Sequence, residues 1–338
     1  MKSKGSAIIW RYLPGILISI LAIFFLSRFV NLKDLIASFQ IFTVADVLVL
    51  TVILVCSLAA RGMAWKTFFN NMSFRDGFLI INEGYLLNNL IPRSGEIARI
   101  FITNSITKND SFQVAAAIFF ERAVDLLIAA GMFLSTMSLV LELQWLRSTA
   151  TWIMVVFTLL LIMILLIAYF SPTIETFIRE KKFKNELIET RVKPIILRAI
   201  QGLTTISQPR KLLPAFVWII VTWCFWVLML YYAILRLSPG APIWWALFTE
   251  GIIALGIALP AAPANLGVYE GTIVFALSVF GISRDSALGA AILMHIIQIA
   301  ITIIFGLAGL FIHDFKISSI IEKIRGQLFK EKIKNQEY

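Results

Sequence analysis

The fold is decided by a stretch that begins like a transmembrane helix and stops too early, FLIINEGYLLNNLIPRSGE at residues 78–96. Its apolar part, 78–91, would form about 14 residues or roughly 21 Å of helix, whereas the hydrocarbon core of a bilayer is about 30 Å thick. Pro92 cannot continue a helical hydrogen-bond ladder, and Gly95 permits unusual backbone dihedral angles. We therefore predict a broken helix that enters the membrane and turns back, followed by a second short apolar piece at 97–106.

A second stretch, WWALFTEGIIALGIALPAAPANLGVYE at residues 244–270, repeats this pattern. Its apolar run, 244–259, ends at Pro260, and another short piece follows at 271–281. In both stretches a Glu-Gly dipeptide precedes the proline, and a Gly and then a Glu follow it. The matching residues are Glu83, Gly84, Gly95 and Glu96 in the first stretch and Glu250, Gly251, Gly267 and Glu270 in the second. Paired segments interrupted by Gly and Pro are typical of transporters built from an internal repeat.

The composition excludes an ordinary soluble protein. Hydrophobic residues make up 59% of the 338 residues and charged residues only 15%, against about 45–50% and about 25% in soluble domains. A spanning helix needs about 20 apolar residues. We predict an all-α polytopic membrane protein with about six full transmembrane helices plus two broken-helix re-entrant hairpins. The predicted full spans are 12–28, 44–62, 113–141, 150–170, 212–236 and 286–312.

The basic residues set the orientation. The formal net charge is +10, and Lys and Arg gather in two segments, 171–211 and 314–338. Because basic segments beside membrane helices stay on the cytoplasmic side, we expect a multi-pass protein of the plasma (inner) membrane with both termini in the cytoplasm. Apolar residues recur at helical spacing in both segments, so we interpret them as amphipathic helices that bind inner-leaflet lipids; solvated tethers are the alternative. The charge indicates lipid rather than nucleic acid as a partner.

The orientation of the spans fixes the direction of the two hairpins. Span 44–62 runs inward and puts Arg61 at its cytoplasmic end, so region 78–111 starts and ends inside, while region 244–281 starts and ends outside. Hairpins that enter from opposite faces predict an inverted repeat. If each hairpin were instead two complete spans, the remaining spans would still cross the membrane in the same directions. The predicted organisation is one transmembrane domain at 1–313, with repeats at 44–141 and 212–312 and the amphipathic segment 171–211, and a basic tail at 314–338.

Polar groups at the first break suit a phosphate. The N-terminus of a half-helix presents partial positive charge and open N–H donors, and Arg93 and Arg99 flank this turn. Arginine can bind phosphate through two parallel hydrogen bonds. Glu96 precedes Arg99 by three residues, so we expect its carboxylate to hold the guanidinium in place. These three residues are candidate substrate-binding residues.

Ionisable residues inside predicted spans are costly unless paired, and they are functional candidates for that reason. In span 113–141, Glu121, Arg122 and Asp125 either contact the substrate or dock this helix on the first hairpin. His295, on an apolar run, is interpreted as a packing residue. A substrate-binding role and a structural role both stay open for Glu83, Asn89, Glu250, Asn265, Tyr269 and Glu270.

The sequence indicates neither a cofactor nor a metal site. It has two histidines and two cysteines, and Cys56 and Cys224 lie in apolar runs, where free cysteine behaves as a small hydrophobic residue. The P-loop pattern G-x-x-x-x-G-K-[ST] is absent from the sequence, so we do not expect this chain to hydrolyse ATP. We therefore predict no cofactor and no metal, and the sequence favours a protein that is not an enzyme.

Three blocks of the sequence resemble one membrane-protein family. They are NNLIPRSGEIAR at 88–99, ERAVD at 121–125 and LPAAPANLGVYEG at 259–271, and they resemble signatures of the lysylphosphatidylglycerol synthase transmembrane-region family. The resemblance covers about residues 10–312. It implies the flippase-like domain of multiple-peptide-resistance proteins, which moves aminoacylated phosphatidylglycerol between leaflets and is fused there to a soluble synthase domain. This sequence ends at Tyr338 without such a domain, so we expect a stand-alone flippase-like member without lysyl transfer.

The leading hypothesis is an integral membrane translocator of an anionic phospholipid or lipid-linked headgroup, not driven by ATP itself. One alternative is a membrane-embedded lipid-modifying enzyme, against which the short outer loops argue. The other alternative is a non-catalytic membrane subunit that docks a separate lipid or glycan synthase. The cargo and the oligomeric state are open at this point.

Overall fold

The computed structural model consists of helices over most of the chain from residue 32 to residue 315. The described residues are 20, 21, 24, 32–92, 94–141, 151, 152, 155, 156, 158, 159, 162, 163, 166, 169–181, 188–206, 208–257 and 262–315. None of these residues lies in a strand, so the described part is all-helical, as predicted. In chain order the elements are α2 (Leu32–Phe39), α3 (Val44–Phe68), α4 (Phe74–Leu90), α5 (Gly95–Thr107), α6 (Ser111–Leu141), α8 (Ser171–Glu180), η1 (Ile188–Val192), α9 (Lys193–Ile206), α10 (Pro209–Leu237), α11 (Trp244–Ile257), η2 (Pro263–Asn265), α12 (Val268–Ser278) and α13 (Arg284–Ile312).

Among the described helices, α3, α10 over Arg210–Leu237, and α13 are long and apolar enough to cross a membrane. The corresponding predicted spans are 44–62, 212–236 and 286–312. The predicted span 113–141 is also one continuous helix, α6. The predicted span 12–28 lies largely outside the described residues, and the predicted span 150–170 is described only in part.

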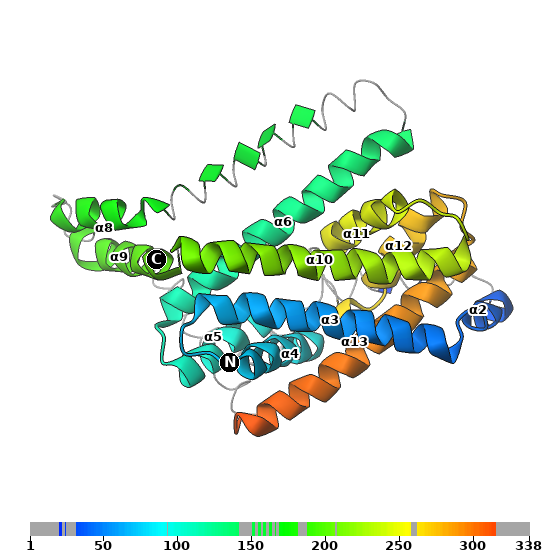
Figure 1. Ribbon diagram of the computed structural model, residues 1–338, viewed down its shortest axis with the longest axis horizontal. Coiled ribbons are helices and arrows are strands. Elements are labelled where there is room, and N and C mark those ends of the chain that lie inside the picture. Colours follow the sequence, from blue (N-terminus) through cyan, green and yellow to red (C-terminus); the bar gives the residue numbers. More distant parts are fainter. Residues whose placement is uncertain are drawn as a thin grey trace, which may run out of the picture.

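α3 and α10 form an antiparallel pair at the centre of the molecule (Figure 1). They are tied together where α3 begins, because Tyr232 Oη donates to Asp46 Oδ1 at 2.6 Å and Arg236 Nε lies 3.3 Å from Asp46 Oδ2. Asp46 also forms a capping box with Thr43, which fixes the start of α3. One carboxylate thus stabilises a helix end and sets the register of the two central helices.

Two pairs of short helices lie toward opposite ends of α3 and α10 (Figure 1). α4 and α5 pack together as the first helical pair, and α11 and α12 pack together as the second helical pair. The first helical pair lies toward the Phe68 end of α3, and the second lies toward the Val44 end. α4 packs along α13 and α11 packs along α6, so each pair rests on the long helix that follows the other pair.

The first break falls where the sequence predicts it. Residues 91–94, which include Pro92, separate α4 from α5. In the second break, Ala264 and Asn265 both adopt a positive φ of 56°, while Pro260 lies outside the described residues. The short helix η2 in this second break packs against α4, so the second break lies beside the first helical pair.

Glycines bring α4 close to its neighbours. A Cβ added at Gly77 would lie 2.6 Å from the carbonyl oxygen of Gly62 on α3, and a Cβ added at Gly84 would lie 2.8 Å from Cγ of Arg99 on α5. A Cβ added at Gly95 would meet the carbonyl oxygen of Gly84. Small residues permit such close helix packing in membranes, where the hydrophobic effect does not drive helices together. The first helical pair is therefore packed backbone against backbone.

The basic segment 171–211 contains the helices α8 and α9, as its apolar spacing predicts. α9 packs on the first turns of α6, where Gly202 lies against the backbone of Phe112. Figure 1 shows α8 and α9 at the end of the molecule that also holds the first helical pair. Of the predicted tail 314–338, the structure describes only residues 314 and 315.

Candidate functional site

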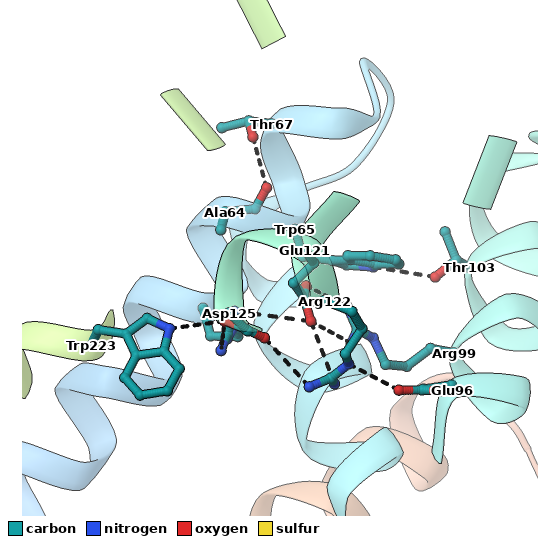
Figure 2. A network of polar contacts seen from close by, with 11 residues as sticks. Ala64, Trp65, Thr67, Glu96, Arg99, Thr103, Glu121, Arg122, Asp125 and Trp223 are labelled. Atoms are coloured by element: carbon teal, nitrogen blue, oxygen red, sulfur yellow. Dashed lines mark hydrogen bonds and ion pairs between the residues drawn. The ribbon is translucent and has the colours of Figure 1, made fainter. Parts of the chain in front are cut away.

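A buried network of arginines and carboxylates lies where α3, α5, α6 and α10 meet (Figure 2). Its central link joins Arg99 of α5 to Glu121 of α6 through two hydrogen bonds, Nη1 to Oε1 and Nη2 to Oε2, each 2.8 Å long. Their side chains are only 4% and 1% exposed. Bidentate pairing fixes orientation as well as charge. Glu121 therefore docks α6 on the first helical pair, which is one of the two roles that the sequence left open for it.

Arg61 is the member of this network that sequence reasoning missed. Its Nη2 donates to Asp125 Oδ1 at 2.9 Å, and its Nη1 lies 4.0 Å from Glu121 Oε1. The expectation that Arg61 lies at a cytoplasmic helix end is wrong, because α3 continues to Phe68 and buries this side chain. A signal was present in the sequence, since the apolar residues GMAW at 62–65 directly follow Arg61 and extend the helix.

The network has an accessible edge formed by Arg122 and Glu96. Arg122 Nε lies 2.9 Å from Glu96 Oε1, and the two side chains are 45% and 51% exposed. The prediction that Glu96 holds Arg99 is wrong, since Glu96 faces Arg122 (Figure 2). Arg99 turns inward to Glu121 instead. Although Glu96 and Arg99 are three positions apart on α5, the neighbouring helix α6 supplies each with a closer partner of opposite charge.

Two tryptophans complete the network. The guanidinium of Arg99 lies over the ring of Trp65, with Cζ 3.9 Å from the ring centroid. Trp65 Nε1 donates to Thr103 Oγ1 at 3.3 Å, and Trp223 Nε1 donates to Asp125 Oδ1 at 2.9 Å. Cation–π contacts gain strength when the cation is held away from water, and a buried indole N–H needs a partner. The tryptophans thereby connect α3 and α10 to the ion pairs.

The formal charges of this network balance. It contains the three arginines Arg61, Arg99 and Arg122 and the three carboxylates Glu96, Glu121 and Asp125. A buried ion is strongly destabilising unless it is paired and hydrogen-bonded, so this balance permits the network to lie between apolar helices. Arg61 Nε, Arg61 Nη1 and Arg99 Nε are buried and have no hydrogen-bond partner among the described residues. These N–H groups remain able to donate to an anion.

The second helical pair carries a different set of groups. His295 Nδ1 of α13 lies 2.6 Å from Glu270 Oε1 of α12, and both side chains are buried. Glu270 Oε2 accepts from the backbone N–H of Gly267 at 2.7 Å, at the start of α12. The ring centroids of Tyr269 and His295 are 4.5 Å apart, and Glu250 of α11 is also buried. His295, interpreted from the sequence as a packing residue, thus has a carboxylate partner.

The other histidine, His313, directly follows the last residue of α13. His313 Nδ1 lies 2.7 Å from Glu83 Oε1 of α4, and its Nε2 lies 3.4 Å from Asp76 Oδ1. Glu83 is completely buried against Gly309, and its Oε2 has no hydrogen-bond partner among the described residues. Burial lowers the pKa of His313, but the hydrogen bonds and charges of Glu83 and Asp76 outweigh burial and raise this pKa above its ordinary value.

Two candidates from the breaks take structural positions. Asn89 Nδ2 donates to Thr302 Oγ1 of α13 at 3.2 Å, which ties the end of α4 to a long helix. Asn265 adopts the left-handed backbone conformation in the second break. Arg93, the other predicted phosphate ligand, lies outside the described residues. The structure thus joins Glu96, Arg99, Glu121, Arg122 and Asp125 in one network, and it places Glu250, Tyr269 and Glu270 in a second group and Glu83 in a third.

These features define an all-helical membrane protein in which ion pairs are buried between interrupted helices. The chain belongs to the family described as Lysylphosphatidylglycerol synthase TM region, whose model matches residues 12–306. The match confirms the resemblance based on the three sequence blocks and makes this a membrane domain of a lipid-related family. No curated protein matches the chain.

Proposed function

We propose that this protein is an integral membrane translocator that moves an anionic phospholipid or a lipid-linked headgroup between leaflets, without hydrolysing ATP itself. Its family is lipid-related, and its longest apolar helices suit the hydrocarbon core of a bilayer. Ionisable groups at membrane depth are functional candidates because they are costly to keep there. The network around Arg99 and Arg122 supplies such groups, and it has the chemistry to receive a phosphate.

The accessible pair of Arg122 and Glu96 is the observation that carries this proposal. A phosphate has the negative charge and the oxygen geometry to replace the Glu96 carboxylate at the Arg122 guanidinium. Behind this pair, buried N–H groups of Arg61 and Arg99 without a hydrogen-bond partner in the described part of the chain add further donors. The exposed edge would therefore bind the headgroup, while the bidentate Arg99–Glu121 pair keeps the frame rigid.

The N-terminus of α5 favours an anion at the same place. Ser94 occupies the N-cap position, but its Oγ donates to the carbonyl oxygen of Leu87 at 2.8 Å and does not cap the helix. Glu96 lies in the first turn, where a negative charge complements the helix dipole. A phosphate that replaces the Glu96 carboxylate would meet the same dipole and the first N–H groups of α5.

Exchange of Glu96 for phosphate would change how the first helical pair is held. The Glu96–Arg122 contact joins α5 to α6 at the accessible edge, and the Arg99–Glu121 contact joins them in the interior. Loss of the outer contact would loosen the edge while the inner contact persists. The released Glu96 carboxylate could then receive the amine of an aminoacylated or zwitterionic headgroup.

We further propose that the two helical pairs are re-entrant hairpins of an inverted repeat, with both chain termini in the cytoplasm. The reciprocal packing of α4 on α13 and of α11 on α6 supports this arrangement. So do the contacts Glu96–Arg122 and Glu270–His295, each of which joins the second short helix of a pair to the long helix after it. The partners are 26 and 25 residues apart in the sequence.

The helices α8 and α9 suit a contact with inner-leaflet lipids in this proposal. Phe177 and Ile196 are 63% and 41% exposed in this basic segment, which combines apolar and cationic groups as interfacial helices do. The same surface would serve the second candidate function, a subunit that docks a separate synthase. Stoichiometric co-purification of a soluble transferase, lost when α8 and α9 are deleted, would favour that subunit role.

The translocator is tested with purified protein in liposomes that contain tail-labelled phosphatidylglycerol, phosphatidylethanolamine or phosphatidylcholine in separate preparations. A membrane-impermeant quencher then reports how fast label from the inner leaflet becomes accessible. We expect the wild-type protein to move the anionic lipid fastest. The variants Arg122→Gln and Glu96→Gln should slow it by roughly tenfold or more, since Arg122→Gln removes the cation that would bind the phosphate and Glu96→Gln removes the carboxylate that would displace the phosphate again.

The matched control is Arg179→Gln on α8. Arg179 also forms an ion pair with a glutamate, Glu175, at 2.6 Å, and it is exposed at 63%. This control should translocate lipid at the wild-type rate. Unchanged rates in both Arg122→Gln and Glu96→Gln would eliminate the proposed site, and rates no higher than in protein-free liposomes for every lipid would eliminate translocation of these lipids.

A further inference from the structure

The sequence contains only two histidines, and both belong to α13 or its C-cap. Each pairs with a glutamate of a different helical pair, His295 with Glu270 and His313 with Glu83, at 2.6 Å and 2.7 Å. The four side chains are between 0% and 9% exposed. Along a helix that rises about 1.5 Å per residue, the two histidines are roughly 27 Å apart. His295 lies eleven residues after the start of α13, inside this apolar helix, and His313 follows its last residue, so the two histidines lie at different depths.

We propose that these two histidine–glutamate pairs are proton-binding sites at different depths along α13, and that proton occupancy controls how firmly α13 holds each helical pair. The proton is then a second ligand of this protein. This inference extends the proposed function, because it supplies a source of energy for translocation in a chain without a P-loop.

Each site has more carboxylates than histidines. At the His295 site, the carboxylates are its partner Glu270 and the buried Glu250. The charge of Glu250 also acts on Tyr269, whose ring lies beside the His295 ring. Near His313 the carboxylates are Glu83 and Asp76. Even with both imidazoles protonated, one negative charge would be left over at each site. Burial makes uncompensated charge unfavourable, so both sites favour proton uptake, unlike the arginine network with its balanced charges.

Other charged groups on the helices around α13 are engaged elsewhere or lie at the surface. On α3 and α10, Asp46 pairs with Arg236, and Arg61 pairs with Asp125. On α2, residues 33 and 34 are a lysine and an aspartate, both exposed. Beside His313, Arg75 lies 3.9 Å from Asp76 and is 70% exposed.

Each site differs from a simple group of acidic residues, because one glutamate oxygen is positioned to take a proton or to face the histidine ring. Glu83 is completely buried, and its Oε2 has no hydrogen-bond partner within the described ranges, which leaves an oxygen beside His313 that can take a proton. At the other site, Glu270 Oε2 is fixed by the Gly267 N–H, so that Oε1 faces the His295 ring. Histidine changes its charge near neutral pH, where arginine does not.

Proton occupancy would act on the contact between helices. A protonated imidazole donates to the glutamate and forms an ion pair, which holds α12 or α4 to α13. Loss of the proton removes that attraction, and at the His313 site it also leaves the neighbouring carboxylates of Asp76 and Glu83 to repel each other. Because the two sites belong to different helical pairs, proton uptake at one site would change how α13 holds one pair and leave the contact with the other pair unchanged.

The full-length protein in lipid nanodiscs, labelled with ¹³C and ¹⁵N in histidine only, tests this inference without any transport measurement. The imidazole signals, followed by NMR from pH 5 to pH 9, are assigned with His295→Gln and His313→Gln. We expect the imidazole of His313 to change its charge in this range. Glu270→Gln should lower the proton affinity of His295 alone, and Glu83→Gln that of His313 alone, by about tenfold or more.

Glu175→Gln, on the exposed helix α8, is the matched control and should move neither titration. If Glu270→Gln does not fold, Glu250→Gln tests the same site and should shift His295 in the same direction. Imidazoles that keep one charge state from pH 5 to pH 9, or titrations unchanged by all of the glutamate variants, would overturn the inference.

A transport measurement separates this inference from the proposed function. Titrating imidazoles in a protein that moves no lipid would retain the proton sites and remove the translocator. Lipid movement by a protein whose imidazoles do not titrate would retain the translocator and remove the proton sites. If both hold, the rate of lipid movement should depend on the pH gradient in the wild-type protein, and this dependence should be lost in His295→Gln.

Discussion

The first helical pair is held to the long helix after it by arginine, whereas the second is held by histidine. In the first, Arg99 and Arg122 reach two glutamates, and Arg61 joins from a third helix. In the second, His295 and Glu270 make the corresponding contact. The local architecture is similar, with a break, a short helix and a long helix, but the cation differs.

This difference teaches what each region can do. A guanidinium stays protonated at every physiological pH, so the arginine network keeps its geometry unless another anion competes for it. An imidazole near neutral pH gains or loses its charge with small changes in proton concentration. We therefore propose that the arginine network exchanges one anion for another, and that the histidine–glutamate pairs respond to protons.

The largest expected effect comes from breaking the interior of the arginine network. Arg99→Ala would leave the buried Glu121 without its bidentate partner, which should lower the free energy of unfolding by about 3–5 kcal/mol. Chemical unfolding in detergent micelles measures this loss. The double variant Arg99→Met with Glu121→Leu removes both charges and should recover most of the stability. If Arg99→Ala lowers the free energy of unfolding no more than His295→Ala does, the contrast between the two regions would be contradicted.

The next effect concerns backbone packing in the two helical pairs. Gly84→Ala places a methyl group against Arg99 of α5 and should destabilise the protein by roughly 1–3 kcal/mol. Gly271→Ala on α12 is the control, because nothing lies within 4 Å of the added Cβ; it should be neutral or stabilise by up to about 1 kcal/mol. Thermal unfolding of both variants tests this, and equal losses would mean that α4 has more room than its glycine contacts indicate.

A smaller effect depends on pH and distinguishes histidine from arginine. His313 binds its proton more tightly in the folded protein, because its pKa is raised from the ordinary value of 6.5. The stabilisation from this pair is therefore fully present below the unfolded pKa and is lost as the pH rises through the folded pKa. The unfolding temperature measured from pH 5 to pH 8 should fall with pH in the wild-type protein, and less steeply in His313→Gln. Parallel curves for the two proteins would exclude this pair as the source.

The smallest expected effect on stability is at the accessible edge of the network. Glu96→Gln removes one half of an ion pair that is about half exposed, and exposed pairs contribute about 0–1 kcal/mol. The unfolding midpoint should therefore stay close to that of the wild-type protein, although the proposed function requires slower lipid movement. A loss of stability as large as that of Arg99→Ala would assign Glu96 to the structural core of the network.

Much of the fold followed from local sequence. The apolar run at 244–259 predicted a short helix, and the described part of α11 covers Trp244–Ile257, with 258–261 outside the described residues. Pro92 marked the first break, and the charges of Glu121 and Asp125 were recognised as unusual within a long apolar run. These predictions succeed because helix length, proline and burial cost act within one segment of the chain.

Pairing between helices was harder to predict. Glu96 and Arg99 are neighbours on one helix, yet each is paired with a residue of α6. Arg61 looked like the end of a span, although it lies buried between Asp125 and Glu121. Sequence spacing describes which residues share a helix face, but it does not reveal what a second helix places opposite that face.

The sequence by itself determined that this chain is a helical membrane protein, where its first helical pair breaks, and which family it belongs to, because apolar length, proline and motif order are properties of the chain alone. Only the tertiary structure decided which cation meets which carboxylate. An ion pair between residues far apart in the chain exists only once packing has brought two helices together. Its free energy depends on burial and geometry that no single segment contains.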